Sequence, residues 1–202
     1  TAAVKKDSQA EHHEELSFLY KYILPVDHKI IGMQYIFTGM IMAIIGGYFS
    51  YAFRMQLAFP GEVVPLYGLV GPGEYNMLVT NHGTIMIFWV AMPVLIAGFG
   101  NYLIPLMIGC DDMVFPRLNR LSYQIFLVSA LVLIASFFVT GGGFGGAWTS
   151  YPPLSTVAEY SLTDWGPSLW ILAVALEFVS FLLGGINFIT TTMNARAPGM
   201  KM

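Results

Sequence analysis

Charged residues are scarce in this sequence. Asp, Glu, Lys and Arg make up 10% of its 202 residues, 56% are hydrophobic, and the mean hydropathy is +0.65. Soluble domains usually carry about 25% charged residues, so this chain has too little charge to cover a water-facing surface. The composition excludes a soluble globular protein and a disordered chain, and the net charge of -3 argues against a nucleic-acid partner. What remains is a membrane protein with several spans.

Cysteine is nearly absent as well. Cys110 is the one cysteine in the sequence, which excludes a disulfide framework and any multi-cysteine metal site. Residues 1–26 also lack a long apolar run, so they are not a secretory signal and are expected to form a polar tail.

Long apolar stretches are abundant. A helix needs about 20 apolar residues to cross a bilayer, and such spans are expected at about 30–52, 77–108, 121–140 and 169–191. The second stretch is too long for one upright span, and Pro93 and Pro105 within it predict a kink, a tilt or an extension beyond the membrane. The sequence therefore predicts an all-α, polytopic transmembrane bundle of four spans over residues 27–202. Small residues that allow close approach of helices or a cofactor recur in these spans, at Gly39, Gly46, Gly47, Gly98, Gly100, Gly184 and Gly185.

The basic residues predict the orientation of the bundle. Eight of the nine Lys and Arg residues precede the first span, separate the second from the third, or follow the fourth, and these three regions share one side of the membrane. Arg54 alone lies on the other side. Because cytoplasmic loops carry the excess of basic residues, both termini are expected on the cytoplasmic side, or on the matrix side in a mitochondrion.

His82 and Arg54 lie at the same expected edge of the bundle. A neutral imidazole is the usual axial ligand of haem iron, and Gly83 would let a flat macrocycle approach the backbone. The residues alone leave two roles open for His82, ligation of a haem or metal and a hydrogen bond between helices. Arg54 is either a snorkelling interfacial cation or a partner for a group near His82. No second histidine lies within an expected span, so this chain alone cannot complete a bis-histidine haem site or a multi-histidine copper site.

Polar residues gather at the opposite edge. Asn101, Asn119 and Asn187 fall at a similar depth on three spans, and Asp112 lies in the adjoining loop. Three amide side chains at this depth can order a chain of water molecules that starts at the exposed carboxylate and carries protons inward. Helix capping by Asn119 and hydrogen bonds between helices by the other two explain the same residues without a ligand.

Glu177 falls in the middle of the fourth span. An isolated carboxyl at this depth is costly and must be protonated, paired or in contact with water. It is either a neutral carboxyl hydrogen-bonded to a neighbouring helix or a proton relay.

At these residues the sequence closely resembles subunit I of the haem–copper oxidases, especially the cytochrome c oxidase branch. The resemblance covers about residues 27 to 200 and includes the Arg54 region. The motifs that carry it occur in order along the chain, as D-H-K-I-I-G-M-Q-Y (27–35), H-G-T-I-M-I-F-W-V-A-M-P (82–93), G-F-G-N-Y-L-I-P-L-M-I-G (98–109), D-M-V-F-P-R-L-N-R-L-S (112–122), W-T-S-Y-P-P-L (148–154), G-G-I-N-F-I-T-T (184–191) and R-A-P-G-M (196–200).

The resemblance implies two sets of site residues. For the low-spin haem, with haem a expected, it implies that His82 is an axial iron ligand and that Arg54 hydrogen-bonds the haem formyl group. Trp148 and Tyr151 would lie over the haem on the outer side. For the D proton pathway it implies an uptake carboxylate and further polar residues, namely Asp112, Asn101, Asn119, Asn187, Ser180 and Tyr35.

The sequence departs from the family pattern at four positions. Arg120 stands where the family often has a second Asn, and Phe181 occupies a position that is often a pathway serine. Gln56 replaces an acidic residue linked to an outer-side cation site, so that cation is not expected. Glu177 falls where a small residue is expected, and the resemblance gives it no role.

The resemblance implies the catalytic subunit of a proton-pumping respiratory oxidase that reduces oxygen to water. The family's subunit has about twelve spans, so these four would be the N-terminal part of a split subunit or of a longer polypeptide, inactive alone. The high-spin haem and copper B would be ligated by the remaining part. Expected partners are that remaining part, oxidase subunits II and III, membrane lipid and cytochrome c, in a bacterial cytoplasmic or mitochondrial inner membrane.

Three other functions stay open at this point. The first is a quinol oxidase of the same superfamily, which differs in its electron donor. The second is a non-catalytic, haem-free four-span assembly protein that kept the oxidase scaffold. The third is a small ion transporter that uses Glu177.

Overall fold

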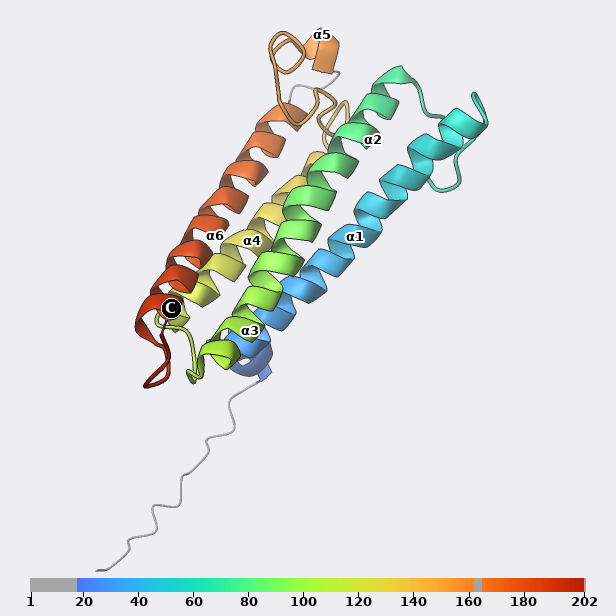
Figure 1. Cartoon of the computed structure of the whole chain (residues 1–202). Coiled ribbons are helices and arrows are strands. Elements are labelled where there is room, and N and C mark those ends of the chain that lie inside the picture. The colour runs from blue at the N-terminus through green and yellow to red at the C-terminus, as the bar shows by residue number, and fades with distance from the viewer. Residues whose placement is uncertain (1–17, 162–164, 202) are drawn as a thin grey trace, which may run out of the picture.

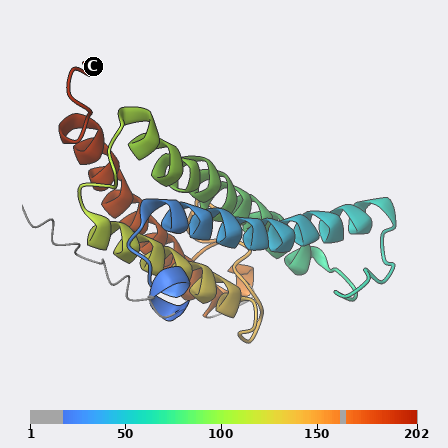
Figure 2. The same cartoon turned by 90° about the horizontal axis from the view of Figure 1, so that it is seen from below.

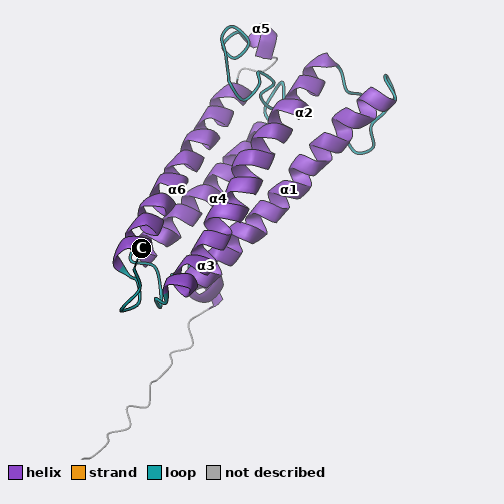
Figure 3. Ribbon diagram, in the orientation of Figure 1, coloured by secondary structure: helices purple, strands orange, loops and turns teal. Residues whose placement is uncertain are grey.

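The computed structural model describes residues 18–161 and 165–201, so most of the tail predicted for residues 1–26 lies outside the described residues. Figures 1 and 3 show an array of helices, and no strand occurs in the described part of the chain. The elements in chain order are the π-helix η1 (Leu19–Ile23), α1 (His28–Ala58), α2 (Pro72–Thr84), the π-helices η2 (Ile85–Ala91) and η3 (Pro93–Gly98), α3 (Phe99–Ile108), α4 (Pro116–Ser136), α5 (Ala158–Ser161) and α6 (Gly166–Asn194).

Four helical segments are long and apolar enough to cross a membrane, which confirms the predicted four-span, all-helical fold. They are His28–Ala58, Pro72–Ile108, Pro116–Ser136 and Gly166–Asn194.

Capping side chains and prolines, which a hydropathy average does not detect, determine where the helices begin. Asp27 caps α1, because its side chain accepts hydrogen bonds from the backbone N–H groups of Lys29 at 2.8 Å and Ile30 at 3.1 Å. The second and third spans open with proline, whose fixed φ suits the first helical turn. Each span therefore begins two to five residues before the edge of its apolar stretch.

The second span runs continuously through α2, η2, η3 and α3 (Figure 1). Pro93 has no N–H to donate, and the backbone around it adopts wider π-helical turns, in which the N–H of Met92 bonds to the carbonyl of Ile87. At 37 residues the segment is about 55 Å long as a helix, far more than the ~30 Å hydrocarbon layer. The helix type therefore changes around Pro93, while the kink, tilt or extension expected there stays a prediction.

The four spans pack in a closed cycle. α1 lies along the whole second span and also contacts α4, α4 lies along α6, and α3 contacts α6. One end of the bundle holds the start of α1, the Ile108–Pro116 loop and the end of α6, and we call it the Asp112 end. The opposite end, where α1 meets α2, is called the His82 end. There α1 leans away from α4 and α6 (Figures 1 and 2).

Glycines spaced seven residues apart let α1 approach the second span. A Cβ built on Gly32 would lie 2.8 Å from the Gly98 carbonyl oxygen, and one on Gly39 would overlap Val94. A Cβ on Gly46 would lie 3.0 Å from the side chain of Ile85. These three residues form the α1 glycine stripe. By contrast, Gly47, Gly184 and Gly185 face open space in the described structure, so helix packing does not require their small size.

Candidate functional site

His82 is held by the backbone of α1. Its Nδ1 lies 2.8 Å from the Gly46 carbonyl oxygen, and its ring packs edge-on against Phe53 with centroids 5.6 Å apart. The contact depends on the α1 glycine stripe, because Gly46 brings the two backbones close. When Nδ1–H donates to this carbonyl, Nε2 keeps its lone pair, which is the arrangement of a metal-ligating histidine.

Two glycines, Gly47 and Gly83, are the chain neighbours of the residues that make this contact. The imidazole is half-buried, and neither Gly47 nor Gly83 has a heavy atom of the described chain within 4 Å of an added Cβ. The described residues contain no cluster of three or more His, Cys, Asp or Glu side chains able to hold a bare metal ion. Among the described residues, His82 is thus not part of a cluster of three or more such side chains.

His28 corrects one expectation. It lies in the first turn of α1 and is 1% exposed, so His82 is not the one histidine within a span. The first span was expected only from about residue 30, so His28 fell between the predicted tail and that span. Gly46, which contacts His82, follows His28 by about five helical turns, roughly 27 Å. The two histidines thus lie at opposite ends and cannot ligate one iron.

The other predicted haem residues form no hydrogen bond or ring contact with His82 in the described part of the chain. Arg54 is exposed and forms no hydrogen bond with the described residues. Trp148 packs against Phe88, with ring centroids 6.3 Å apart, and is 62% exposed. Tyr151 is also exposed, and only its backbone carbonyl is bound, by the N–H of Ser155.

Asp112 is half-buried at its end of the bundle. Its Oδ1 accepts a hydrogen bond from the Met113 N–H at 2.6 Å. Partial burial raises the pKa of the Asp112 carboxyl above its usual value, while the N–H of Met113 and the charge of His28 act in the opposite direction. The net effect of these groups is a raised pKa of the Asp112 carboxyl.

The three predicted asparagines behave differently. Asn187 is fully used by the loop before α4, because its Oδ1 accepts from the Phe115 N–H at 3.0 Å and its Nδ2 donates to the Phe115 carbonyl at 3.3 Å. Asn101 Nδ2 donates to the backbone carbonyl of Ala97 at 2.7 Å, and the backbone carbonyl oxygen of Asn101 lies 2.8 Å from Nδ1 of His28. Asn119 is completely buried, yet neither polar side-chain atom has a partner within the described chain. Asn119 is thus the asparagine with the most unused hydrogen-bonding capacity.

Tyr35 and Ser180 meet in a buried cluster that also includes Ser122. The Tyr35 hydroxyl donates to Ser122 Oγ at 3.0 Å and lies 3.3 Å from Ser180 Oγ. Ser122 in turn donates to the Asn119 carbonyl at 2.7 Å, and Ser180 donates to the Ser122 carbonyl at 2.8 Å. We call these residues the hydroxyl cluster. It joins α1, α4 and α6 next to Asn119.

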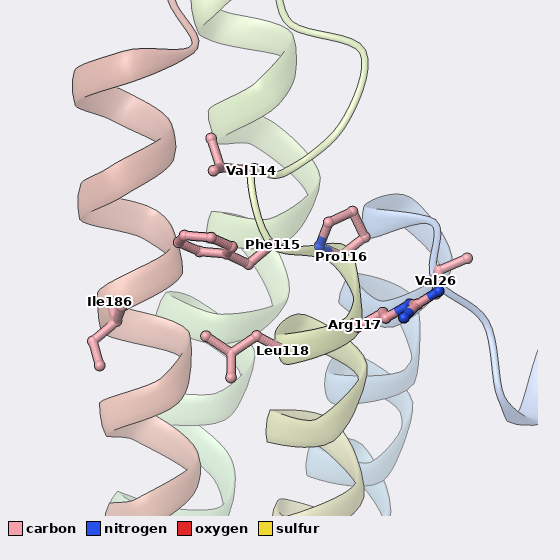
Figure 4. A pocket seen from close by; sticks show the side chains of 7 residues that line it. All are labelled: Val26, Val114, Phe115, Pro116, Arg117, Leu118 and Ile186. Carbon is pink, nitrogen blue, oxygen red and sulfur yellow. The ribbon is translucent and has the colours of Figure 1, made fainter.

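An apolar groove lies beside this end of the bundle. It has a volume of about 750 Å³ and runs between α6 and the start of α4 (Figure 4). Its lining residues are Val26, Val114, Phe115, Pro116, Arg117, Leu118 and Ile186.

Sequence reasoning missed three residues of these networks. Ser122 lies one turn after Asn119 in a quoted motif, and His28 begins another, so both could have been found there. Ser129 contacts Glu177, and its signal is the seven-residue spacing from Ser122 along one face of α4.

These observations describe a class of protein: a four-span membrane bundle with a histidine hydrogen-bonded to a backbone carbonyl at one end, and a half-buried carboxyl and buried polar side chains toward the other. Comparisons place this class in a family. The sequence profile described as "Cytochrome C and Quinol oxidase polypeptide I" matches residues 30–202, and the chain belongs to this haem–copper oxidase subunit I family.

Curated relatives agree with this assignment. The chain is 43% identical over 194 residues to cytochrome c oxidase subunit 1 of Thermostichus vulcanus, covering 96% of this chain and 33% of the relative. It is 41% identical over 199 residues to the subunit of the same name from Synechocystis sp., covering 98% and 34%. It is also 38% identical to that of Cereibacter sphaeroides, covering 94% and 38%. The chain thus spans about a third of the length of these relatives.

Proposed function

We propose that the chain forms the N-terminal part of the catalytic subunit of a respiratory oxidase that reduces oxygen to water and pumps protons. In this role the His82 end contributes to a low-spin haem site, and the Asp112 end takes up protons. The names of the relatives favour cytochrome c over quinol as the electron donor. The remaining part of subunit I would supply the high-spin haem and copper B, and subunits II and III would complete the complex.

The observation that carries the haem assignment is the contact between His82 and Gly46. A carbonyl 2.8 Å from Nδ1 fixes the ring orientation and leaves Nε2 as the ligating atom. A haem iron bound there would supply one-electron transfer. Arg54 is the nearby cation suited to a formyl oxygen, and Trp148 and Tyr151 would cover the outer side of the site. Because Arg54 is exposed, its side chain is free to turn toward such a group.

The proton assignment rests on the order of polar groups along the bundle. Partial burial raises the pKa of Asp112, and Asn119, whose side-chain amide is unpaired among the described residues, accepts a hydrogen bond from Ser122 of the hydroxyl cluster through its backbone carbonyl. An amide with both polar atoms buried and unpaired can orient water in each direction. Asn101 lies at the same end, where its oxygen Oδ1 is also buried and lacks a partner among the described residues.

The haem assignment is tested by replacing each histidine in the assembled complex. His82→Ala should abolish the low-spin haem signal in the reduced-minus-oxidised absorption spectrum. His28→Gln, at the opposite end of α1, should retain it. An intact low-spin signal in His82→Ala would refute ligation, and a complex that lacks haem altogether would favour the non-catalytic assembly protein.

The proton assignment has a matched pair of variants in neighbouring carboxyls. Asp112→Asn should slow turnover and abolish pumping, whereas Asp111→Asn should change neither, because Asp111 is exposed. The measurement is proton release by vesicles that contain the complex. Normal pumping in Asp112→Asn would contradict the role.

The membrane and its orientation are proposed on the distribution of basic residues. We propose a bacterial cytoplasmic or mitochondrial inner membrane, with the Asp112 end on the cytoplasmic or matrix side. The described ends of the chain, at Phe18 and Lys201, both belong to the Asp112 end, as an even number of spans requires.

A further inference from the structure

Glu177 lies at the centre of the bundle, outside every role assigned above. It is 1% exposed and sits on the face of α6 that packs against α4. Its Oε2 lies 3.0 Å from Ser129 Oγ, and Ser129 Oγ accepts a hydrogen bond from Trp89 Nε1 at 3.0 Å. The three side chains therefore join α6, α4 and the second span at one point.

The hydrogen count at Ser129 defines two states of this site. The Ser129 hydroxyl has one hydrogen but two acceptors in reach, the Phe126 carbonyl at 2.6 Å and Glu177 Oε2 at 3.0 Å. If Glu177 is neutral, its O–H donates to Ser129 Oγ, and Ser129 donates to Phe126. If Glu177 is ionised, the Ser129 hydroxyl turns and donates to the carboxylate instead. A short hydroxyl rotation thus stabilises either protonation state.

No cation in the described surroundings of Glu177 holds its carboxyl permanently in the ionised state. Its one hydrogen-bonding partner is Ser129, and no cation of the described chain pairs with it. An unpaired carboxyl in an apolar interior rests in its neutral form. Its second oxygen, Oε1, is buried and has no protein partner within the described residues, so this atom is left for exchange with water.

The Glu177 site lies next to the hydroxyl cluster along α6. Ser180 of the hydroxyl cluster lies one helical turn from Glu177 on the same buried face of α6, on the side toward the Asp112 end. Tyr35 lies near enough to Glu177 for an electrostatic interaction between the two groups. Ser129 lies about 15 Å from Asn119 along α4. Glu177, which contacts Ser129, is therefore farther from the Asp112 end than the hydroxyl cluster is.

We propose that Glu177 is a proton-exchanging carboxyl that takes protons from the side of the hydroxyl cluster. The proposal rests on the proposed proton uptake through Asp112. In each cycle the neutral carboxyl releases one proton toward the bundle interior and becomes a carboxylate, which the Ser129 hydroxyl then stabilises. One proton arriving through water at Oε1 restores the neutral form and returns the hydroxyl to Phe126.

The test uses infrared difference spectra of the assembled oxidase between its oxidised and reduced states. We expect a C=O band of a protonated carboxyl that shifts in D₂O, is lost in Glu177→Gln and changes frequency in Ser129→Ala. Glu62→Gln, which alters an exposed carboxyl, is the control and should leave the band unchanged. Proton uptake should slow about tenfold or more in Glu177→Gln, and by less than about twofold in Glu62→Gln.

The outcomes separate this proposal from the proposed function. If Asp112→Asn slows uptake while Glu177→Gln changes neither uptake nor the carboxyl band, Glu177 is a structural hydrogen-bonding residue and the proposal is wrong. If neither variant changes uptake, proton uptake at the Asp112 end fails as well. Should Glu177→Gln not assemble, the wild-type band decides, because a carboxyl band that does not shift in D₂O or is unaltered in Ser129→Ala refutes exchange at this site.

Discussion

The substitution Gly32→Ala tests whether close backbone approach holds α1 against the second span. The added Cβ would lie 2.8 Å from the Gly98 carbonyl oxygen and 3.3 Å from the backbone nitrogen of Tyr102. Both atoms belong to a helix backbone and cannot rotate away, so the two helices must separate by about half an ångström. Overpacking of this kind costs about 1–3 kcal/mol, against a gain of up to ~1 kcal/mol from better helix propensity. We expect a net loss of up to about 2 kcal/mol.

The matched control is Gly47→Ala, one position away from the stripe. No heavy atom of the described chain lies within 4 Å of a Cβ there, so only the favourable propensity change, up to ~1 kcal/mol, should remain. The assay is equilibrium unfolding of the chain in mixed micelles with increasing dodecyl sulfate, followed by helical circular dichroism. Equal stability of the two variants would refute the reasoning, since it would mean that the α1 interface yields without cost.

Three further predictions concern the Asp112 end. Asn187→Ala should lower the unfolding free energy by about 1–3 kcal/mol because it removes two hydrogen bonds to the loop backbone. Asn119→Ala removes no hydrogen bond, so it should lower the unfolding free energy by less than Asn187→Ala does, yet it should slow proton uptake. A larger loss of stability in Asn119→Ala than in Asn187→Ala would contradict the assignment. His28→Gln should raise the pKa of Asp112 further, because the imidazole charge lowers it, and an infrared titration that subtracts Asp112→Asn would show the midpoint moving to higher pH. Burial raises the pKa of the Cys110 thiol, so an impermeant maleimide should react more slowly than with a free thiol, and only from the cytoplasmic face of oriented vesicles; labelling from the outer face would reverse the proposed orientation.

The number of spans could be predicted from the sequence because bilayer crossing depends on a bulk property, the mean hydropathy of about 20 residues. The helix ends depend on local geometry instead. The third span, α4, ends at Ser136, although Phe137, Phe138 and Val139 continue the apolar run. The chain turns there, and Gly141 and Gly142 follow with φ of 85° and 80°. Hydropathy counts an apolar turn as part of a span, so it placed the end near residue 140.

The site residues show a sharper limit. Asn119 and Asn187 have the same side chain, fall at the same predicted depth and receive the same role from the resemblance. In the fold, the loop before α4 uses both polar atoms of Asn187, whereas both polar atoms of Asn119 are buried and unpaired by described residues. A buried amide is available to water only if the protein leaves its hydrogen bonds unmade. That availability depends on which backbone groups of other elements reach the amide, and no local pattern in the sequence records it. The same reasoning applies to Glu177. Its sequence position predicts a buried carboxyl, but the facing Ser129, with one hydrogen and two acceptors, is what supports the proposal that its charge changes, and only the fold brings the two together.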